Sequence, residues 1–494
     1  MKKRKSLSEE LGLEEFYDKS AAFDIGTETV KQAVKSKLFS DDRERILIMK
    51  RKKTNIALIA AAICAIAVTT SFASPTVRDK VGEIISFFQN ENAAEISSID
   101  RLAEFNKSIG KSVAKNGYTL TLDNVAADDN FVHVFYTIHS EDKPLIGDNG
   151  EPVINCWAEC MINGKSAAMN TNHNSGDYYF ADSYTAKYAE KYNVAAADIP
   201  DKFMLELYAD IGEITAGIDD KIYNGEPITD EDKEKMWYIS AEIDKSAVKV
   251  ESVTRQIGIN LPDSIATVEK AVFSPFGNQL VITTKANNGG ADSVVPNVDN
   301  FALYDENNTC LDVLNTDLCA NSDGSSSNSF EFLKADANTR ELKFVPVKYS
   351  KKSSDSKIIF NPVGTYPTEY KTSDYGKVVV TGIKIKDGEI DIDYYKDGFV
   401  MYDPAFVLAN DAGENAEPGG KHGCTQYINV NYETNSYTAR YVYESFDSSG
   451  KPLPLTENVK ADSLKKNFTK LGVIENHDFT LDFDNAVTVR LTAE

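Results

Sequence analysis

The stretch YTLTLDNVAADDNFVHVFYTI, from Tyr118 to Ile138, indicates most clearly how the larger part of this chain folds. Apolar or aromatic residues alternate with polar ones in both halves of the stretch, and this period of two is typical of strands that bury one face. The Asp and Asn residues between the halves favour a turn. The stretch therefore predicts a strand, a polar turn and a second strand.

Two later stretches have the same form. They are IATVEKAVFSPFGNQLVITTK, from Ile265 to Lys285, and VVVTGIKIKDGEIDIDYYKDG, from Val378 to Gly398. The residues after them are also similar, because FALYD (Phe301 to Asp305) resembles FVLAN (Phe406 to Asn410). The three stretches begin about 147 and 113 residues apart, close to the size of an immunoglobulin-like sandwich. We therefore predict a mainly β fold of tandem immunoglobulin-like β-sandwich domains. The alternative is two sandwiches and one irregular β domain.

A long uncharged apolar run, IALIAAAICAIAVTTSFA from Ile56 to Ala73, precedes the β-rich part. At about 1.5 Å per residue this run nearly crosses a bilayer core of about 30 Å. The basic cluster on its N-terminal side consists of Lys50, Arg51, Lys52 and Lys53. Because basic residues stay on the cytoplasmic side of a span, the pattern predicts a single-pass cell-membrane protein. Its N-terminus is cytoplasmic and its C-terminal region extracellular.

These patterns divide the chain into six segments. They are a cytoplasmic helical segment at 1–53, a transmembrane helix at 54–75, a juxtamembrane helix and linker at 76–110, a first β-sandwich with insertions at 111–245, a second at 250–365 and a third at 376–494.

The outer end of the apolar run, Ser71-Phe72-Ala73, has the small-x-small form that signal peptidase reads. This form is compatible with a cleaved leader, a retained span, or a retained span that is cut at Ser71 and Ala73 under regulation. A leader normally begins with a brief basic region, whereas here 53 residues with their own hydrophobic pattern precede the run. We therefore expect a retained span.

Charge is divided unevenly along the chain. The whole chain carries a net charge of −23. Residues 1–53 carry +4, so the remainder carries −27. Such an acidic outer region has no excess of cations to bind phosphates, which excludes nucleic acid as its partner.

The inside segment contains short helical patterns, one of which places Val30, Val34 and Leu38 on one face. This stripe is too narrow for a self-sufficient core, and such segments often fold against a partner. The alternative is a solvated tail without a partner. Since no Cys or His precedes Cys64, a zinc site of the His/Cys type is excluded there.

No catalytic, metal-binding or cofactor-binding pattern stands out, so we do not expect an enzyme. The five histidines have no metal-ligand spacing, and no phosphate loop or nucleophile elbow occurs. Asp387, Glu389, Asp391 and Asp393 alternate along a strand, which favours a solvent-facing strand side over a calcium loop. Cys310 and Cys319 flank a short polar loop; they either form a disulfide or are small buried apolar residues.

The chain resembles the anti-sigma-factor-like single-span proteins of Gram-positive bacteria, whose ectodomains are of unknown function. The similar stretches are the basic cluster with the span, ETVKQAVKSKL (Glu28 to Leu38), SPTVRDKVGEIISFF (Ser74 to Phe88), GYTLTLDNVAADDNFVHVFYTI (Gly117 to Ile138), VEKAVFSPFGNQLVI (Val268 to Ile282) and DFTLDFDNAVTVRL (Asp478 to Leu491). The resemblance implies a regulator whose residues 1–53 bind a sigma factor. It also implies that cleavage just outside the membrane releases that factor.

Together these patterns predict a membrane regulator that binds a transcription regulator inside and senses or docks at an unknown envelope ligand or protein outside. The alternative is a membrane-anchored surface binding or adhesion protein with a passive cytoplasmic tail.

Overall fold

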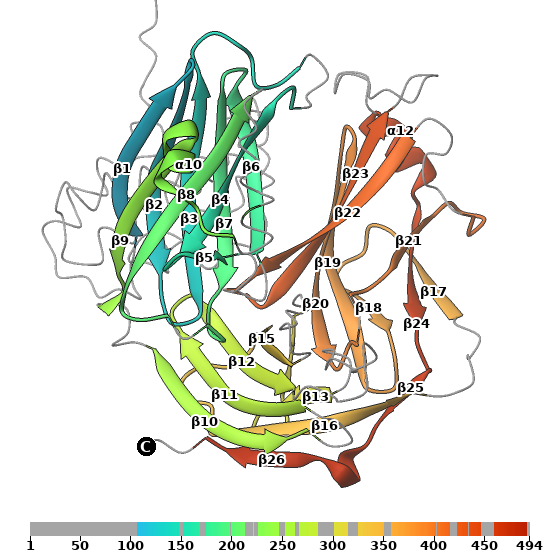
Figure 1. Ribbon diagram of the computed structural model, residues 1–494. Helices are drawn as coiled ribbons and strands as arrows, with labels where there is room; N and C mark the ends of the chain where they lie inside the picture. Colours follow the sequence, from blue (N-terminus) through green and yellow to red (C-terminus); the bar gives the residue numbers. More distant parts are fainter. Residues whose placement is uncertain are drawn as a thin grey trace, which may run out of the picture. The chain divides into compact units, whose positions relative to one another are not determined.

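The computed structural model describes residues 106–147, 152–167, 174–197, 199–212, 221, 226–246, 252–261, 266–284, 301–314, 325–349, 357–401, 403–414, 422–432, 434–445 and 459–491. These residues are mainly β, in several antiparallel sheets with a few short helical elements (Figure 1). Within these ranges, no helix has the length and apolar character needed to cross a bilayer. The apolar run from Ile56 to Ala73 and residues 1–53 lie outside the described residues.

The first sheet pair encloses one core between a five-stranded and a four-stranded sheet. The five-stranded sheet has the order β1 (Asn106–Lys115), β2 (Tyr118–Ala127), β3 (Phe131–Ser140), β7 (Thr185–Asn193) and β6 (Asn174–Asp182). The four-stranded sheet has the order β5 (Lys165–Ser166), β4 (Asn155–Ile162), β8 (Lys202–Gly212) and β9 (Trp237–Asp244). Leu122 and Tyr136 of one sheet share the core with Leu207 and Trp237 of the other.

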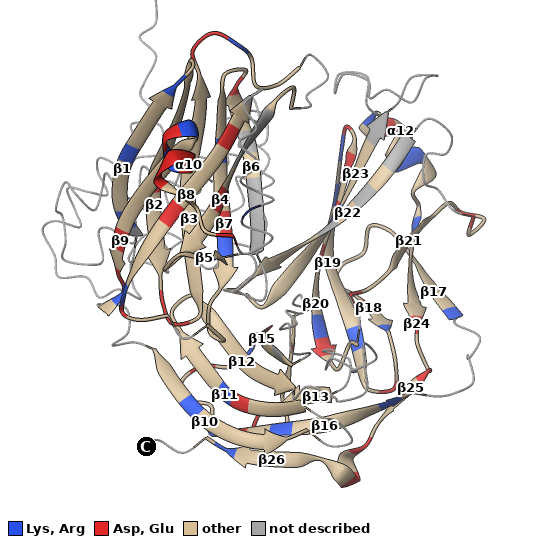
Figure 2. Cartoon of the chain, viewed as in Figure 1, with Lys and Arg blue, Asp and Glu red and all other residues tan. Residues whose placement is uncertain are grey.

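One short helix, α10 (Asp230–Lys235), leads into β9. It begins at a capping box in which the Thr229 hydroxyl accepts from the Asp232 backbone N–H and the Asp232 carboxylate accepts from that of Thr229. Its first turn is acidic and its last turn is basic, which complements the helix dipole (Figure 2).

The second sheet pair includes the C-terminal strands of the chain. Its first sheet has the order β10 (Val253–Asn260), β11 (Ala266–Ser274), β12 (Gly277–Thr284) and β15 (Ser326–Phe332). Its other sheet contains β14 (Cys310–Leu311), β13 (Phe301–Tyr304), β16 (Glu341–Tyr349), β25 (Phe479–Leu481) and β26 (Val487–Arg490), with η3 (Phe483–Asn485) between the last two. Both β25 and β26 pair with β16, so these strands, which the sequence pattern assigned to the third domain, complete a sheet of the second pair.

The third sheet pair combines a three-stranded and a five-stranded sheet. The smaller sheet has the order β17 (Lys357–Pro362), β24 (Lys470–Glu475) and β21 (Phe406–Ala409). The larger has the order β18 (Thr368–Lys371), β19 (Gly376–Lys386), β20 (Glu389–Gly398), β23 (Ser436–Ser445) and β22 (His422–Asn431). The core between them includes Tyr394 of β20, Leu408 of β21 and Leu464 of α12 (Ala461–Asn467).

The three predicted strand–turn–strand stretches form the hairpins β2–β3, β11–β12 and β19–β20, and all three share one irregularity. In each hairpin the register shifts once within the first strand, at Asp123, Glu269 and Thr381. The residue at the shift then bonds to the second strand. Asp123 accepts from the Thr137 hydroxyl at 2.7 Å and Glu269 from the Thr283 hydroxyl at 2.5 Å, while Thr381 donates to a backbone carbonyl at 3.1 Å. The likeness of the three stretches therefore extends to backbone geometry.

The turns after β13 and β21 are also built alike. The Asp305 carboxylate accepts from the N–H groups two and four residues later, at 2.9 and 2.7 Å. The Asn410 side-chain oxygen likewise accepts from the N–H groups of Ala412 and Glu414, two and four residues later, at 2.9 and 3.0 Å. The residue three positions on has a positive φ in both turns, Asn308 at 58° and Gly413 at 79°. The resemblance of FALYD to FVLAN thus reflects one shared turn, and in the second sheet pair this turn carries residues that line a pocket.

Candidate functional site

Lys191 of β7 contacts residues from all three sheet pairs. Its Nζ donates to both carboxylate oxygens of Glu331 in β15, at 2.9 and 3.2 Å, and to the hydroxyl of Tyr432 after β22, at 2.9 Å. The ammonium also lies 4.2 Å from the ring centroid of Phe131 and 4.8 Å from that of Tyr432. The side chains of Lys191 and Glu331 are only 6% and 8% exposed. We call Lys191, Glu331 and Tyr432 the three-way junction.

His133 and Gly277 fit closely around the three-way junction. His133 lies opposite Lys191 in the β3–β7 register, and its ring meets the Phe276 ring edge-on at 5.2 Å. Burial, together with the Lys191 charge, holds the pKa of His133 well below its usual range, so the imidazole is neutral at pH 7. A Cβ at Gly277 would lie 2.9 Å from Glu331 Oε1, which leaves no room for a larger residue without a shift.

The turn between β2 and β3 makes a second contact between the first two sheet pairs. Asp128 Oδ1 accepts from the N–H groups of Asn130 and Phe131, at 2.7 and 2.8 Å, and Oδ2 accepts from the Phe276 N–H at 2.9 Å. Asn130 Nδ2 donates to the carbonyl oxygen of Val272 at 2.9 Å. Burial of Asp128 raises the pKa of its carboxyl to about 6. This polar turn therefore connects the first and second sheet pairs by hydrogen bonds.

The turn between β22 and β23 joins the third sheet pair to the second through a buried carboxylate. Asn435 Oδ1 accepts from the Lys334 N–H at 3.2 Å. Lys334 Nζ donates to Asp312 Oδ1 and to the Lys396 carbonyl oxygen, each at 2.8 Å. The Tyr437 hydroxyl donates to the other oxygen of Asp312 at 2.9 Å. The Asp312 carboxylate thus accepts hydrogen bonds from both sheet pairs. Its side chain is only 3% exposed, so it is shielded from water.

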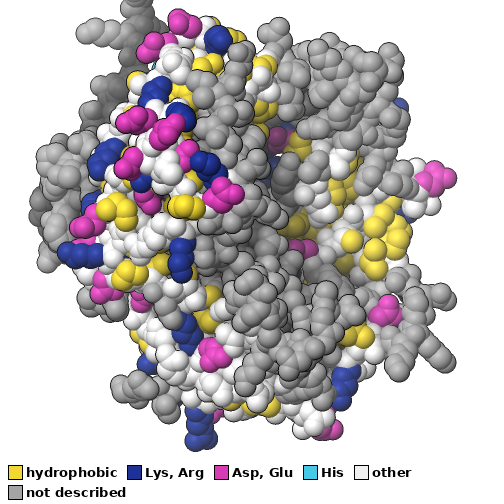
Figure 3. Space-filling model, viewed as in Figure 1, with side chains coloured by type: hydrophobic (Ala, Val, Ile, Leu, Met, Phe, Trp, Pro, Cys, Tyr) yellow, Lys and Arg dark blue, Asp and Glu magenta, His cyan; other side chains and the backbone are white. Residues whose placement is uncertain are grey.

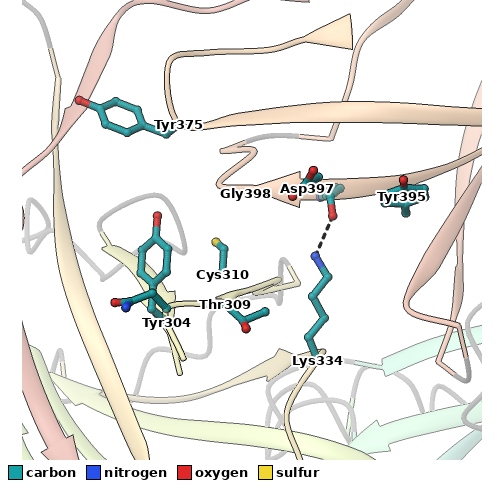
Figure 4. A pocket seen from close by; sticks show the side chains of 10 residues that line it. Tyr304, Thr309, Cys310, Lys334, Tyr375, Tyr395, Asp397 and Gly398 are labelled. Atoms are coloured by element: carbon teal, nitrogen blue, oxygen red, sulfur yellow. Dashed lines mark hydrogen bonds between the residues drawn. The ribbon is translucent and has the colours of Figure 1, made fainter. Parts of the chain in front are cut away.

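A pocket of about 610 Å³ opens next to these residues, within the usual range of about 300–1,000 Å³ for small-molecule sites. Its lining consists of Tyr304, Asn308, Thr309, Cys310 and Lys334 from the second sheet pair and Tyr375, Tyr395, Lys396, Asp397 and Gly398 from the third. In Figure 4 the Lys334 side chain reaches across to β20, where its dashed bond ends on the Lys396 carbonyl oxygen. The pocket thus takes residues from two sheet pairs.

The charges at the pocket are paired within the protein. Lys396 Nζ lies 3.0 Å from Asp403 Oδ1, and Asp397 Oδ2 lies 3.4 Å from Lys377 Nζ. Burial raises the pKa of the Cys310 thiol to about 12, so this thiol stays protonated at pH 7. The described lining therefore offers neither a thiolate nucleophile nor an unpaired ammonium group.

Two glycines shape the wall that the third sheet pair contributes. Gly376 and Gly398 are register partners at the open end of the β19–β20 hairpin. A Cβ at Gly376 would lie 2.3 Å from the Phe399 carbonyl oxygen, and one at Gly398 would lie 2.3 Å from that of Tyr375. The Phe399 N–H donates to the Tyr375 carbonyl oxygen at 2.9 Å. This close approach of two backbones fixes the position of Tyr375.

A partly buried carboxyl, that of Glu190, lies in the first sheet pair one residue before Lys191. The Tyr136 hydroxyl donates to Oε1 at 2.7 Å, and the Tyr192 hydroxyl donates to Oε2. Desolvation raises the pKa of Glu190 to about 7, although both hydrogen bonds act in the opposite direction. Glu190 is therefore partly protonated near neutral pH.

Most of the site residues predicted from the sequence lie outside the described residues. These are the basic cluster Lys50 to Lys53, the cleavage positions Ser71 and Ala73, the partner face of Val30, Val34 and Leu38, and Cys319. Cys310 is buried in the pocket lining. Its pairing with Cys319 stays a prediction.

The prediction that the alternating acidic residues of this strand face solvent is wrong for Asp391. This residue is 4% exposed, and its Oδ1 accepts from Arg440 Nε at 2.7 Å across the β20–β23 pair, so its charge is neutralised inside the protein. Among the described residues, no cluster of His, Cys, Asp or Glu has a metal-site arrangement. On the face shown in Figure 3, basic and acidic side chains of the described residues are interspersed.

Neither the three-way junction nor, apart from Cys310, the pocket was predicted from the sequence. The signal for the junction is clearest in β15, where Glu331 stands between Phe330 and Phe332. Such interruptions are a reason to look for a buried ion pair.

Comparisons with known proteins give a partial match. Residues 49–140 match a family described as a domain of unknown function (DUF4179), from the basic cluster to the last residue of β3. No curated protein matches the sequence. A solved structure titled "The crystal structure of the conserved domain protein from Bacillus anthracis" is similar, with 16% identity and a TM-score of 0.33, over 52% of this chain and 82% of that one.

Proposed function

We propose that this chain is a single-pass membrane regulator of the anti-sigma-factor-like kind. Its residues 1–53 bind a transcription regulator in the cytoplasm, and its β-rich region, of tandem immunoglobulin-like sandwiches, senses or docks at the cell envelope. We propose no enzymatic activity for it.

The observation that carries this proposal is the uncharged apolar run from Ile56 to Ala73 behind four consecutive basic residues. A hydrophobic run with this flank favours a span with a cytoplasmic N-terminus. The family match supports one continuous unit, because residues 49–140 include both the run and β1 to β3. A chain built in this way has one part on each side of the membrane.

The contacts within the β-rich region support a role in sensing. Lys191 bonds to the second and third sheet pairs at once, and the β22–β23 turn bonds to both Lys191 and Lys334. A ligand in the pocket would contact Lys334 and Lys396, which belong to this set of polar contacts. Binding there would favour one arrangement of the contacts, and a shift in population is the physical basis of a signal.

Release of the partner is proposed to follow a cut at the outer end of the span. Ser71 and Ala73 are the small residues of the small-x-small pattern. Envelope stress would then produce a shortened C-terminal species, which gel mobility of a C-terminally tagged chain would detect. A single full-length species under every stress condition would contradict this part of the proposal.

The test of partner binding is capture from cells with the full chain. We expect a sigma factor to co-purify with the wild type and to be lost when Val30, Val34 and Leu38 are changed to Asp, because charge on this face prevents apolar docking. The matched control changes Thr29, Gln32 and Ser36 to Asp. These positions lie on the opposite side of the same helical pattern, so capture should persist with an equal added charge.

The adhesion alternative predicts a different outcome of the same experiment. A passive tail would give no specific partner for the wild type, and neither triple variant would change the captured proteins. That result would overturn the proposed function.

A further inference from the structure

The pocket between the second and third sheet pairs combines aromatic rings with polar groups. Tyr304, Tyr375 and Tyr395 all line it, and Tyr395 is 40% exposed. The faces of aromatic rings carry partial negative charge and attract the slightly positive hydrogens of C–H groups.

The polar groups on the opposite wall are held in place by the turn after β13. Asp305 accepts from the Asn307 and Thr309 N–H groups, and Asn308 has a positive φ of 58°. Asn308 and Thr309 are both exposed and line the pocket. The turn therefore presents an amide and a hydroxyl on a rigid backbone.

The charge balance argues against an anionic ligand. Lys334 donates to Asp312, whose other oxygen is occupied by Tyr437, and Lys396 pairs with Asp403. An anion would have to separate Lys334 from a carboxylate that is 3% exposed, which leaves a buried charge without a partner. A neutral ligand meets no such cost.

We propose that this pocket binds a neutral saccharide. Sugar rings present C–H groups on their faces and hydroxyl groups at their edges, so one face stacks on Tyr395 while the edge bonds to Asn308, Thr309 and Asp397. The pocket volume of about 610 Å³ fits a small-molecule ligand of this kind. The proposal deepens the proposed function and rests on it in one respect, since it names the ligand class that the outer region would sense.

The test is calorimetric titration of the purified full chain in detergent with neutral cellohexaose, chitohexaose and mannohexaose, and with hexagalacturonate as an anionic probe. We expect at least one neutral glycan to bind and hexagalacturonate not to bind. Tyr395→Ala should weaken binding at least tenfold. Tyr184→Ala is the matched control, because Tyr184 is 41% exposed on the first sheet pair and should leave the affinity unchanged.

The outcomes separate cleanly. Because the Tyr395 side chain is exposed and is not part of the core, Tyr395→Ala should fold. A circular dichroism melt verifies that it does. Absence of binding by all three neutral glycans, binding of hexagalacturonate alone, or an equal loss in both Tyr variants would each overturn the proposal. Because the titration needs no cytoplasmic partner, its failure is distinct from a failure to capture a sigma factor.

Discussion

The three-way junction allows a quantitative prediction. In Lys191→Met the Glu331 carboxylate, 8% exposed, loses its only ion-pair partner among the described residues. Removing one member of a buried ion pair typically costs about 3–5 kcal/mol of unfolding free energy. Lys191→Met also removes the bond to Tyr432 and the contact with the Phe131 ring. We therefore expect a loss in the upper half of that range.

The reverse variant should be milder. In Glu331→Leu the Lys191 ammonium keeps the Tyr432 hydroxyl at 2.9 Å and the Phe131 ring at 4.2 Å. A desolvated cation–π contact contributes up to about 2 kcal/mol, which offsets part of the loss. The double variant leaves neither charge buried. It should therefore be more stable than Lys191→Met alone, with a coupling energy of about 2–3 kcal/mol.

Urea unfolding followed by tryptophan fluorescence suits this cycle, because both tryptophans of the chain, Trp157 and Trp237, lie in strands of the first sheet pair. The control is the exposed pair Glu231 and Lys235 on α10, whose loss should leave the midpoint unchanged. If Lys191→Met costs less than about 1 kcal/mol, or the double variant costs the sum of the singles, the junction does not hold the sheet pairs together.

Two further predictions concern the third and first sheet pairs. Gly376→Ala places a methyl group 2.3 Å from the Phe399 carbonyl oxygen and should destabilise the third sheet pair by about 3 kcal/mol in thermal unfolding. Gly382→Ala on the same strand, with its nearest contact at 3.6 Å, should be tolerated, and equal effects of the two would refute the reasoning. Burial raises the pKa of Glu190 from 4.5 to about 7, so the folded state binds this proton more tightly and stability falls as the pH rises from about 4.5 to 7. Glu190→Gln should flatten this fall in pH-dependent urea unfolding, and an unchanged slope would contradict it.

The local hairpins were predictable from the sequence because they depend on neighbouring residues. Alternation over Tyr118 to Ile138 is enough to indicate β2 and β3, since each strand buries one face and the turn lies between them. The same holds for β11–β12 and β19–β20. The likeness of FALYD to FVLAN was visible for the same reason.

Long-range features were not predictable, because alternation does not tell which outer face another sheet covers. Lys191 and Glu331 are 140 residues apart, and each occupies a strand position that would normally face water. Asp391 was assigned to solvent by this rule, but Arg440 of the neighbouring strand β23 buries it. The pocket depends on such contacts, since its walls come from two sheet pairs.

The central claim, that the chain crosses the membrane once with its N-terminus inside, is tested most directly by cysteine labelling in intact cells. The exposed Cys424 thiol serves as the outside position in the natural chain, and a Ser6→Cys variant in which the other cysteines are changed to Ser provides the inside position. A membrane-impermeant maleimide should label Cys424 in intact cells, and should label position 6 only after the cells are permeabilised. Labelling of position 6 in intact cells, or protection of Cys424 until permeabilisation, would contradict the account.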